Sequence, residues 1–289
     1  MKNKIALMIV TFNPSVMQIK KFHTMQMYVD KLLVIDNSYS IKIERQLKKI
    51  KNKKIEVIFN GGNFGIGKPT NYFFDYLKNY PEYNWALLMD QDSLLEFDIH
   101  SILKNLCKNR IKVAGLSYSE NRIAQNIKQK PILKKIKRHI HSGLIIHKSI
   151  FYKFKYDERL FLDMSDFDFC ANLQKNNIDI YNIENFFIQH FVGNPNLNNF
   201  LFLRKFRTNH PPINCFFMSR NRVIMIKKGL YSRGYINLIL NQIKEILLTI
   251  IFEKNIYLKI KARILGFYCG INNTIFNDIN EIKKYININ

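Results

Sequence analysis

The chain has 289 residues, of which 47% are hydrophobic, and it carries a net charge of +23. This composition suits one large globular domain, or a domain of about 200 residues with a helical appendage, and it excludes collagen, coiled coil and wholesale disorder. The charge favours a phosphate-rich partner such as nucleic acid, an anionic bilayer or a pyrophosphate-linked substrate, although biased composition explains about half of the excess.

The first part of the chain alternates apolar runs with amphipathic segments. We predict strands at 5–11, 31–35, 55–59, 85–89 and 113–118, and helices at 15–29, 41–51, 70–79 and 98–108. This alternation is typical of βαβ crossovers and a mostly parallel sheet flanked by helices. In such sheets ligands bind at the carboxyl ends of the strands.

The rest of the chain changes character. Residues 120–141 are polar and basic and are predicted to form a mobile loop, before an apolar strand at 144–146. Residues 205–289 hold fourteen Lys and Arg against four Asp and Glu, and we expect them to be mainly helical. The predicted organisation is an α/β domain over 1–231 and a helical C-terminal extension over 232–289.

Three polar clusters follow predicted strands, at Thr11–Asn13, Asp36–Asn37 and Asp90–Asp92. Two carboxylates two residues apart at a strand end can share Mg²⁺ or Mn²⁺, which prefer hard oxygen ligands and often complete their shell with substrate phosphates. When position is ignored, a solvated turn or a helix cap is the favoured explanation of the Asp90 and Asp92 pair, and the position at a strand end reverses that preference. Asp36 could accept hydrogen bonds from a base or ribose, or form an Asx turn.

A glycine-rich loop, NGGNFGIG at residues 60–67, joins a predicted strand to a helix. Its backbone N–H groups could approach a phosphate or a sugar, or the loop could be an ordinary tight turn. It lacks the Lys-Ser/Thr of a P-loop, which disfavours ATP or GTP hydrolysis.

Four motifs occur in order: TFNP, LVIDNS, NGGNFGIG and WALLMDQDS. Together they resemble glycosyltransferase family 2 over residues 4–231, and the DQDS variant is similar to its bacterial rhamnosyltransferase-like group. The resemblance implies a GT-A fold, which is a Rossmann-like, mostly parallel mixed sheet flanked by helices. It also implies a nucleotide-sugar donor and a divalent cation, Mg²⁺ or Mn²⁺.

The resemblance also assigns roles to matching positions. Donor-binding residues would be Thr11, Asn13, Asp36, Asn63, Gly65 and Asp90. Asp92 would be the direct metal ligand, and His190 in the family's His-x-x-Gly pattern would be a further metal or pyrophosphate contact. Outside that pattern, a histidine beside aromatic residues is more often a hydrogen-bonded core residue.

The segment LDMSDFDFC at residues 162–170 resembles the acidic stretch that holds the family's catalytic base. Ser165 stands where relatives have an acidic or similar residue, which leaves Asp166 as the predicted base, with Asp163 and Asp168 as alternatives. An inverting transferase needs one carboxylate to take the acceptor proton, and burial among phenylalanines would raise its pKa. Without the resemblance, alternating acids and aromatics indicate a half-exposed strand.

Arg220, in the sequence FFMSRN, matches an aromatic pair followed by Arg-Asn near the family's acceptor end. The guanidinium group of Arg220 could bind a donor pyrophosphate. Alternatively, Arg220 could lie at the start of a helix with its guanidinium group in solvent.

No stretch reaches the roughly 20 apolar residues of a membrane span, because polar residues interrupt 236–252. Apolar residues there recur at helical spacing and are followed by Lys259, Lys261 and Arg263. This pattern fits an interfacial helix on anionic lipid, and it also fits a helix packed on the catalytic domain, which is the commoner case. The four separated cysteines indicate neither zinc nor disulfides, which suits a cytoplasmic protein that could sit peripherally on the inner membrane face.

The sequence therefore predicts transfer of a sugar, by resemblance rhamnose from dTDP-rhamnose, onto a glycan or a polyprenyl-diphosphate-linked acceptor of a capsule, O-antigen or similar surface polymer. UDP-galactose or UDP-N-acetylhexosamine are alternative donors. A nucleotidyltransferase would show a Gly-rich basic loop after the first strand, where TFNP stands. A nucleic-acid-binding module is disfavoured because the positive charge is spread and no reader motif is present.

Overall fold

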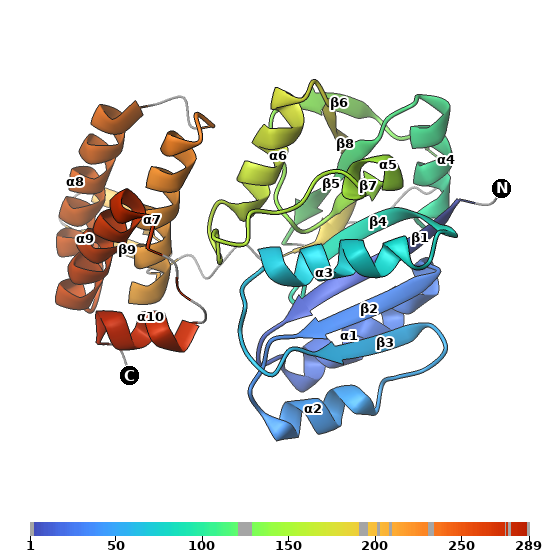
Figure 1. Cartoon of the computed structure of the whole chain (residues 1–289), viewed down its shortest axis with the longest axis horizontal. Coiled ribbons are helices and arrows are strands. Elements are labelled where there is room, and N and C mark those ends of the chain that lie inside the picture. Colours follow the sequence, from blue (N-terminus) through green and yellow to red (C-terminus); the bar gives the residue numbers. More distant parts are fainter. Residues whose placement is uncertain are drawn as a thin grey trace. The chain divides into compact units, whose positions relative to one another are not determined.

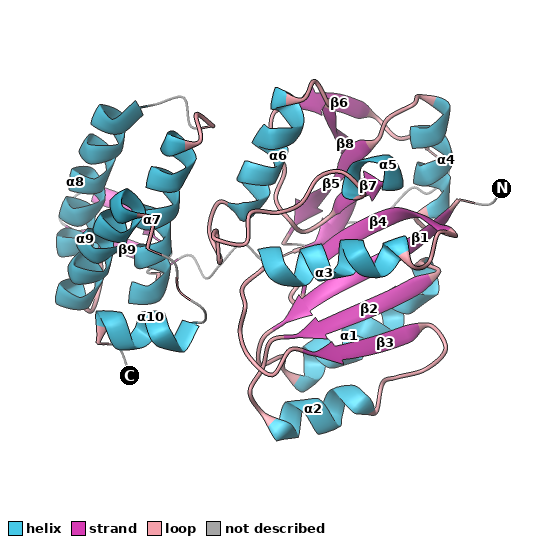
Figure 2. Cartoon of the chain, viewed as in Figure 1, coloured by secondary structure: helices cyan, strands magenta, loops and turns pink. Residues whose placement is uncertain are grey.

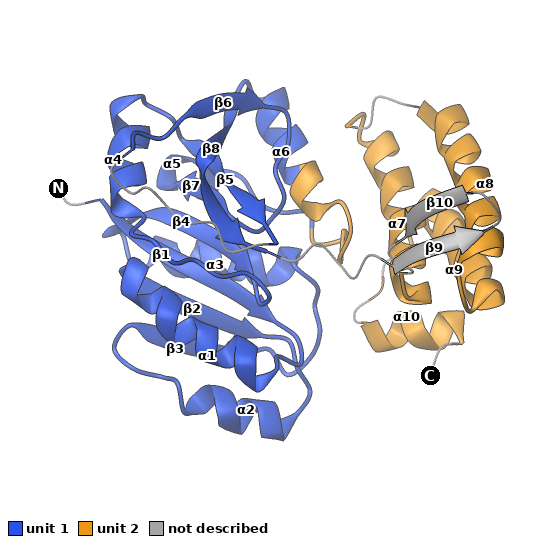
Figure 3. Ribbon diagram, turned by 180° about the vertical axis from the view of Figure 1, so that it is seen from behind, with its two compact units in different colours: residues 1–157, 169–191 blue, residues 158–168, 192–289 orange. Residues whose placement is uncertain are grey.

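A computed structural model describes residues 3–120, 129–190, 210–230, 234–274, 276 and 279–287, and the backbone of 196–200 and 203–207. The chain forms two compact units, one of residues 1–157 and 169–191 and one of residues 158–168 and 192–289 (Figure 3). The expected boundary at residue 231 falls inside the second unit, and the division into a catalytic domain and an extension stays a prediction.

The first unit is built on one eight-stranded sheet with the strand order β3-β2-β1-β4-β7-β5-β8-β6 (Figures 1 and 2). Its strands are β1 (Lys4–Thr11), β2 (Lys31–Asp36), β3 (Ile55–Phe59), β4 (Tyr83–Asp90), β5 (Val113–Ser119), β6 (Leu133–Ile136), β7 (Leu144–His147) and β8 (Ile180–Gln189). The first four strands are parallel to one another, and β7 runs antiparallel between β4 and β5. The sheet is therefore mixed, with a parallel half that carries the predicted site.

Helices cover both faces of this sheet. They are α1 (Val16–Met25), α2 (Ile41–Lys48), α3 (Gly67–Lys78), α4 (His100–Lys108) and α5 (Lys148–Phe151), with a short 3₁₀ helix at Gln26–Tyr28, while α6 (Ser165–Lys175) begins in the second unit and ends in the first. Buried side chains of α1, α2 and α4 pack on one face, and those of α3, α5 and α6 pack on the other. The expected α/β class, with a sheet between helical layers, is confirmed.

Alternation along β1 explains why both faces must be covered. Ile5, Leu7 and Ile9 belong to one buried cluster, whereas Ala6 and Met8 belong to the other. All five are fully buried, as expected of a central parallel strand. Each large apolar side chain contributes about 1.5–3 kcal/mol when it leaves water, so the core holds the strand ends in fixed positions.

The second unit is mainly helical. It contains α7 (Pro212–Lys227), α8 (Gly234–Phe252), α9 (Ile256–Asn272) and α10 (Ile279–Ile286), and a two-stranded sheet of β9 (Asn196–Phe200) and β10 (Leu203–Arg207). A separate core of Phe161, Phe216, Phe217 and neighbours holds it together. The expectation of a helical C-terminal part is confirmed.

The structure differs from the sequence prediction in two segments. Within the predicted loop 120–141, residues 133–136 form the edge strand β6, which pairs antiparallel with β8, while 121–128 lie outside the described residues. The helix α8 has 19 residues and a mean hydropathy of 1.4, so by length and composition alone it could cross a membrane. The interrupting polar residues of α8 do not shorten the helix, contrary to the expectation that no segment reaches such a length.

Candidate active site

The register of three parallel strands brings the predicted polar clusters to one edge of the sheet. Thr11 at the end of β1 pairs with Asp36 at the end of β2, and Val10 pairs with Asp90 at the end of β4. The loop after β1 also contacts the loop after β4, because Phe12 N–H donates to Gln91 Oε1 at 2.8 Å. This arrangement follows from parallel pairing, which places successive carboxyl ends side by side.

Asp36 is the centre of the first cluster. Its Oδ1 accepts hydrogen bonds from the hydroxyls of Thr11 at 2.7 Å and Ser38 at 2.8 Å. Burial raises the pKa of Asp36 above its ordinary value, and these hydrogen bonds oppose that rise only in part. Ser38 Oγ also accepts from the backbone N–H of Asn13 at 2.7 Å, so the same network holds the TFNP loop.

The glycine-rich loop is tied to the same cluster through Asn37. Its side-chain amide donates to the carbonyl of Gly65 at 2.8 Å, and its Oδ1 accepts from Asn60 at 2.8 Å. Asn63 turns back to accept from the N–H of Gly65 at 3.0 Å. Gly65 has φ +71°, a conformation that favours glycine, which explains its place in this turn. Asn63 and Gly65 therefore lie beside Asn37, the residue that follows Asp36, and their role in donor binding stays a prediction.

His190 reaches the Asp90 and Asp92 pair from a position about 100 residues later in the sequence. It follows β8, whose last residue, Gln189, exchanges backbone hydrogen bonds of 2.8 and 3.0 Å with Leu94. The N–H of His190 donates to the carbonyl of Ser119 at the end of β5 at 3.0 Å. These backbone bonds fix the imidazole beside the turn that follows β4. Gly193, the last position of the His-x-x-Gly pattern, lies outside the described residues.

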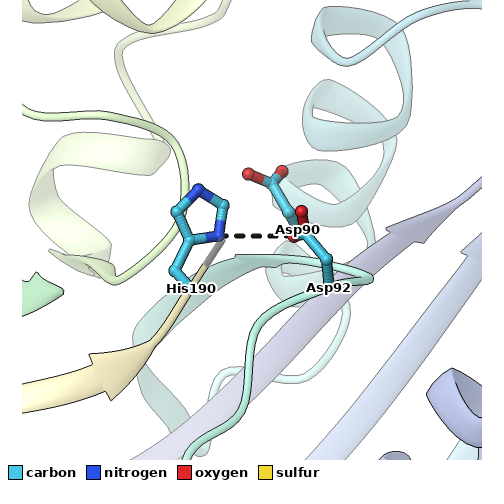
Figure 4. Close-up of side chains that lie close together, drawn as sticks. All are labelled: Asp90, Asp92 and His190. Atoms are coloured by element: carbon cyan, nitrogen blue, oxygen red, sulfur yellow. Dashed lines mark ion pairs between the residues drawn. The ribbon is translucent and has the colours of Figure 1, made fainter. Parts of the chain in front are cut away.

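Asp90, Asp92 and His190 form a cluster whose ligand atoms all lie within 4.8 Å of one another (Figure 4). His190 Nδ1 lies 3.3 Å from Asp92 Oδ1. That oxygen is buried and, apart from this contact with the imidazole, has no hydrogen-bond partner among the described residues. Two carboxylates and one imidazole form a donor set that suits Mg²⁺ or Mn²⁺, and an unsatisfied buried carboxylate oxygen is what a cation would satisfy. The residues therefore fit a divalent metal.

A chain of two hydroxyls orients the imidazole. Ser93 Oγ lies 2.8 Å from His190 Nδ1 and 2.5 Å from Ser142 Oγ, which accepts the backbone N–H of Asp90 at 3.4 Å. Burial alone would lower the pKa of His190, but the hydrogen bond and charge of Asp92 and the charge of Asp90 raise it above its ordinary value. No described residue bonds Nε2, so this nitrogen is available to a cation when Nδ1 carries the proton toward Ser93.

The acidic segment 162–170 is the start of a helix, and the alternative interpretation as a strand is wrong. Asp166 and Asp168 lie in the first turn of α6, where carboxylates are favoured by the helix dipole. Asp166 is half-buried and accepts the backbone N–H of Phe167 at 2.8 Å. It belongs to the second unit, whereas Asp90, Asp92 and His190 belong to the first, and its role as base stays a prediction.

The two alternative carboxylates have other partners. Asp168 is buried and forms an ion pair with Lys228. Burial raises the pKa of Asp163, and the charges of Arg222 and His210 oppose that rise. The rise in pKa that burial was expected to cause in an acid of this segment is therefore found at Asp163.

Arg220 is buried in the second unit. Its Nη1 donates to the carbonyl of Arg159 at 2.7 Å, and its Nη2 donates to the carbonyl of Thr274 at 2.8 Å. A solvated head at a helix start, the alternative considered from the sequence, is wrong because the side chain is only 3% exposed. These carbonyls give Arg220 a structural role, and its contact with a donor phosphate stays a prediction.

Three residues of the site carried no predicted role. Gln91 joins the loops after β1 and β4, and Ser93 and Ser142 support His190. Gln91 and Ser93 were visible in the DQDS motif, but only long-range pairing shows what these two residues and Ser142 contact.

No family model and no curated protein matches the chain. Solved structures that are similar in fold include S. aureus TarS, with 13% identity over 87% of this chain and 44% of that chain and a TM-score of 0.47. S. aureus TarS 1–349 has 13% identity over 98% of this chain and 78% of that chain, with a TM-score of 0.46. A197 from STIV has 12% identity over 65% of this chain and 86% of that chain, with a TM-score of 0.40. This chain thus spans less than half of the TarS chain in the first of these structures.

Proposed function

We propose that this protein is a metal-dependent, inverting glycosyltransferase of the GT-A type that uses a nucleotide-sugar donor. The observation that carries the proposal is the convergence of Asp90, Asp92 and His190 at the sheet edge that also holds Asp36. A cation site beside a polar cluster at the carboxyl ends of parallel strands supports binding of a nucleoside diphosphate.

The proposed chemistry divides between the two clusters. Asp36 and Thr11 would bind the base or ribose, and the loop with Asn63 and Gly65 would lie against the donor. Asp90, Asp92 and His190 would hold Mg²⁺ or Mn²⁺, which offsets the negative charge of the departing nucleoside diphosphate. The donor phosphates would complete the cation's ligand shell, which fixes the leaving group at this edge of the sheet.

Asp166 is the proposed base. It would take the proton of the acceptor hydroxyl while that oxygen attacks the anomeric carbon opposite the leaving diphosphate, so the configuration inverts. The bond from carbon to the diphosphate oxygen breaks as the new glycosidic bond forms. The proton ends on the Asp166 carboxylate, and the diphosphate leaves as an anion.

The proposed donor is dTDP-rhamnose, on the likeness of the DQDS motif to the rhamnosyltransferase-like group, and UDP-galactose and UDP-N-acetylhexosamine are the alternatives. The proposed acceptor is a glycan or a polyprenyl-diphosphate-linked saccharide of a bacterial surface polymer. Such substrates suit a cytoplasmic enzyme at the inner face of the membrane.

A thermal-shift screen of the full chain tests the proposal. Each of the three nucleotide sugars is added with Mn²⁺ or with EDTA, to the parent chain, to Asp92→Asn and to Asp179→Asn as a control. Asp179 is 48% exposed and pairs with Lys135 in an ordinary surface ion pair. A donor that binds the folded state at about a hundred times its Kd should add roughly 2.7 kcal/mol of stability.

The expected result is a rise in Tm for one donor, in the presence of Mn²⁺ only, in the parent and in Asp179→Asn but not in Asp92→Asn. Mass spectrometry of products with that donor then identifies the transferred sugar. If no nucleotide sugar shifts the Tm under either condition, or if Asp92→Asn responds like the parent, the proposal is wrong.

A further inference from the structure

Two polar side chains of the helix α8 are turned inward together with Leu238, and most of its large apolar side chains are turned outward. Gln242 is 8% exposed and Thr249 is fully buried, whereas Leu240 and Leu247 are 58% and 54% exposed. A helix that packs on a soluble core shows the opposite pattern. The outward side chains of α8 define an apolar face, which consists of Ile236, Ile239, Leu240, Ile243, Leu247 and Ile250.

The apolar face continues onto the neighbouring helix. Ile239, Ile243 and Ile246 of α8 line a shallow apolar groove with Ile264 and Phe267 of α9. Ile264 is itself 58% exposed. Contiguous exposed apolar surface of this extent is uncommon on soluble monomers and marks an interaction surface.

The acidic groups of α8 and the turn after it are neutralised inside the unit. Glu253 pairs with Lys259 at 2.7 Å, with both side chains buried, and Glu245 lies 3.6 Å from Arg263. The sequence suggested that Lys259 and Arg263 would face a lipid surface, and this is wrong because both are only 2% exposed.

The exposed charges beside the apolar face are cations instead. Lys244 and Lys254 are exposed, and Lys244 lies one helical turn from Leu240. Tyr235 in the first turn of α8 and Tyr257 in the first turn of α9 are 45% and 76% exposed. Tyrosines of this kind are enriched where a membrane meets water.

We propose that the apolar face binds an anionic lipid bilayer, with α8 lying in the plane of the membrane surface. Apolar residues flanked by lysines and tyrosines are the chemistry of an interfacial helix. A second copy of the chain fits less well, because self-association would place like charges of Lys244 and Lys254 close together. This inference is independent of the sugar-transfer chemistry.

The contacts of α8 favour a surface position over a membrane span. Ser219 of α7 donates a 2.7 Å hydrogen bond to Gln242 Oε1, and Lys244 and Glu245 lie near the middle of the helix. A span would break the hydrogen bond and place both charged groups in hydrocarbon, which is costly.

Flotation of the full chain with vesicles tests the proposal. One vesicle type contains phosphatidylcholine alone, and the other contains an equal mixture of phosphatidylcholine and phosphatidylglycerol. The variant Leu240→Glu/Leu247→Glu is compared with Met17→Glu/Met27→Glu, which makes the same charge change at methionines that are 70% and 64% exposed in the first unit. Lys244→Gln/Lys254→Gln tests the contribution of charge.

We expect the parent to float with the mixed vesicles and much less with phosphatidylcholine alone. The two leucine substitutions should weaken binding by at least about tenfold, and each lysine substitution by about fivefold. The methionine control should bind like the parent. Circular dichroism melting checks that each variant is folded. We expect all of them to fold because the substituted residues are exposed.

Four results would overturn the proposal. The first is a parent chain that does not float with the mixed vesicles, and the second is a leucine variant that binds as well as the parent. The third is an oligomer of the parent, seen by light scattering, that Leu240→Glu/Leu247→Glu dissociates, which would assign the apolar face to a second copy of the chain. Resistance of bound protein to alkaline carbonate extraction would contradict the surface position of α8.

Discussion

His190 Nδ1 lies 2.8 Å from the hydroxyl of Ser93, a residue 97 positions earlier in the sequence. Ser93 immediately follows Asp92, so one turn supplies both a carboxylate of the cluster and the group that orients its imidazole. Support of a metal-binding histidine through its second ring nitrogen typically changes metal affinity by about 10- to 100-fold. Ser93→Ala should therefore weaken Mn²⁺ binding by about that factor, as measured by titration calorimetry.

A second serine–histidine pair provides the control for Ser93→Ala. Ser149 Oγ lies 3.0 Å from His147 Nδ1, and this pair is away from the cluster, where β7 meets α5. Ser149→Ala removes the same kind of hydroxyl and should leave the Mn²⁺ affinity unchanged. Equal Mn²⁺ affinities for Ser93→Ala and the parent would mean that the hydroxyl does not position His190 for a metal.

Substitutions should distinguish a catalytic role for one carboxylate of α6, Asp166, from a structural role for another, Asp168. Asp166→Asn should nearly abolish turnover while donor binding and the melting temperature stay close to those of the parent, because asparagine keeps the size of this half-buried side chain and its acceptor for the N–H of Phe167. Asp168→Asn should instead lower the free energy of unfolding by about 1–2 kcal/mol, because it weakens a charge-assisted contact of a buried carboxylate with Lys228.

Turnover and urea denaturation of both variants distinguish the two roles. Normal turnover in Asp166→Asn would remove this residue from the role of base. Loss of turnover in Asp168→Asn at parental stability would move that role to Asp168.

Gly266 allows α9 to pack closely on α7. A Cβ atom at this position would lie 2.2 Å from the carbonyl oxygen of Phe216, and one at Gly270 would lie 2.8 Å from the carbonyl oxygen of Arg220. Gly266→Ala should destabilise the protein by about 2 kcal/mol. This loss would occur although alanine favours a helix by about 0.5–1 kcal/mol over glycine.

Chemical denaturation measures the effect of Gly266→Ala, with Asn272→Ala at an exposed position of the same helix as the control. The control should change stability by less than about 0.5 kcal/mol. A variant Gly266→Ala that is as stable as the parent would show that the two helices can separate without cost.

The sequence predicts the parallel half of the fold well because its strands are mostly apolar, and the central ones are continuous apolar runs. The predicted strands at 5–11 and 31–35 agree closely with β1 and β2, and the polar residues that follow them meet at one edge. Strand ends are local features, and parallel pairing follows from the alternation of strands and helices. The common location of Thr11, Asp36 and Asp90 therefore follows from the sequence alone.

Features that depend on distant pairing were not predictable in this way. The edge strand β6 is polar because only part of its surface packs on the sheet, so its sequence resembles a loop. The support of His190 by Ser93 depends on the backbone pairing of Gln189 with Leu94, which leaves no periodic signal in the sequence. The inward position of Arg220, Lys259 and Arg263 depends on carbonyls and carboxylates that only the folded unit brings near.

His100 should make the stability of the first unit depend on pH. Its Nε2 lies 2.9 Å from Asp30 Oδ2, and its Nδ1 lies 2.6 Å from Asp98 Oδ1. Burial alone would lower the pKa of His100, but these two carboxylates raise it above its ordinary value. The stabilisation is therefore fully present below the unfolded pKa of about 6.5, and it is lost as pH rises through the higher folded pKa.

The variant His100→Gln isolates this contribution. Parent and variant should differ most in free energy of unfolding near about pH 6 and least near about pH 9, with a difference of about 1 kcal/mol or less because the imidazole is 30% exposed. Urea denaturation at both pH values measures this, with His23→Gln as the control, since His23 meets the side chain of Gln26 and not a carboxylate. A gap between parent and His100→Gln that is constant with pH, or that grows as pH rises, would mean that the protonated imidazole does not stabilise the junction of α4 with Asp30.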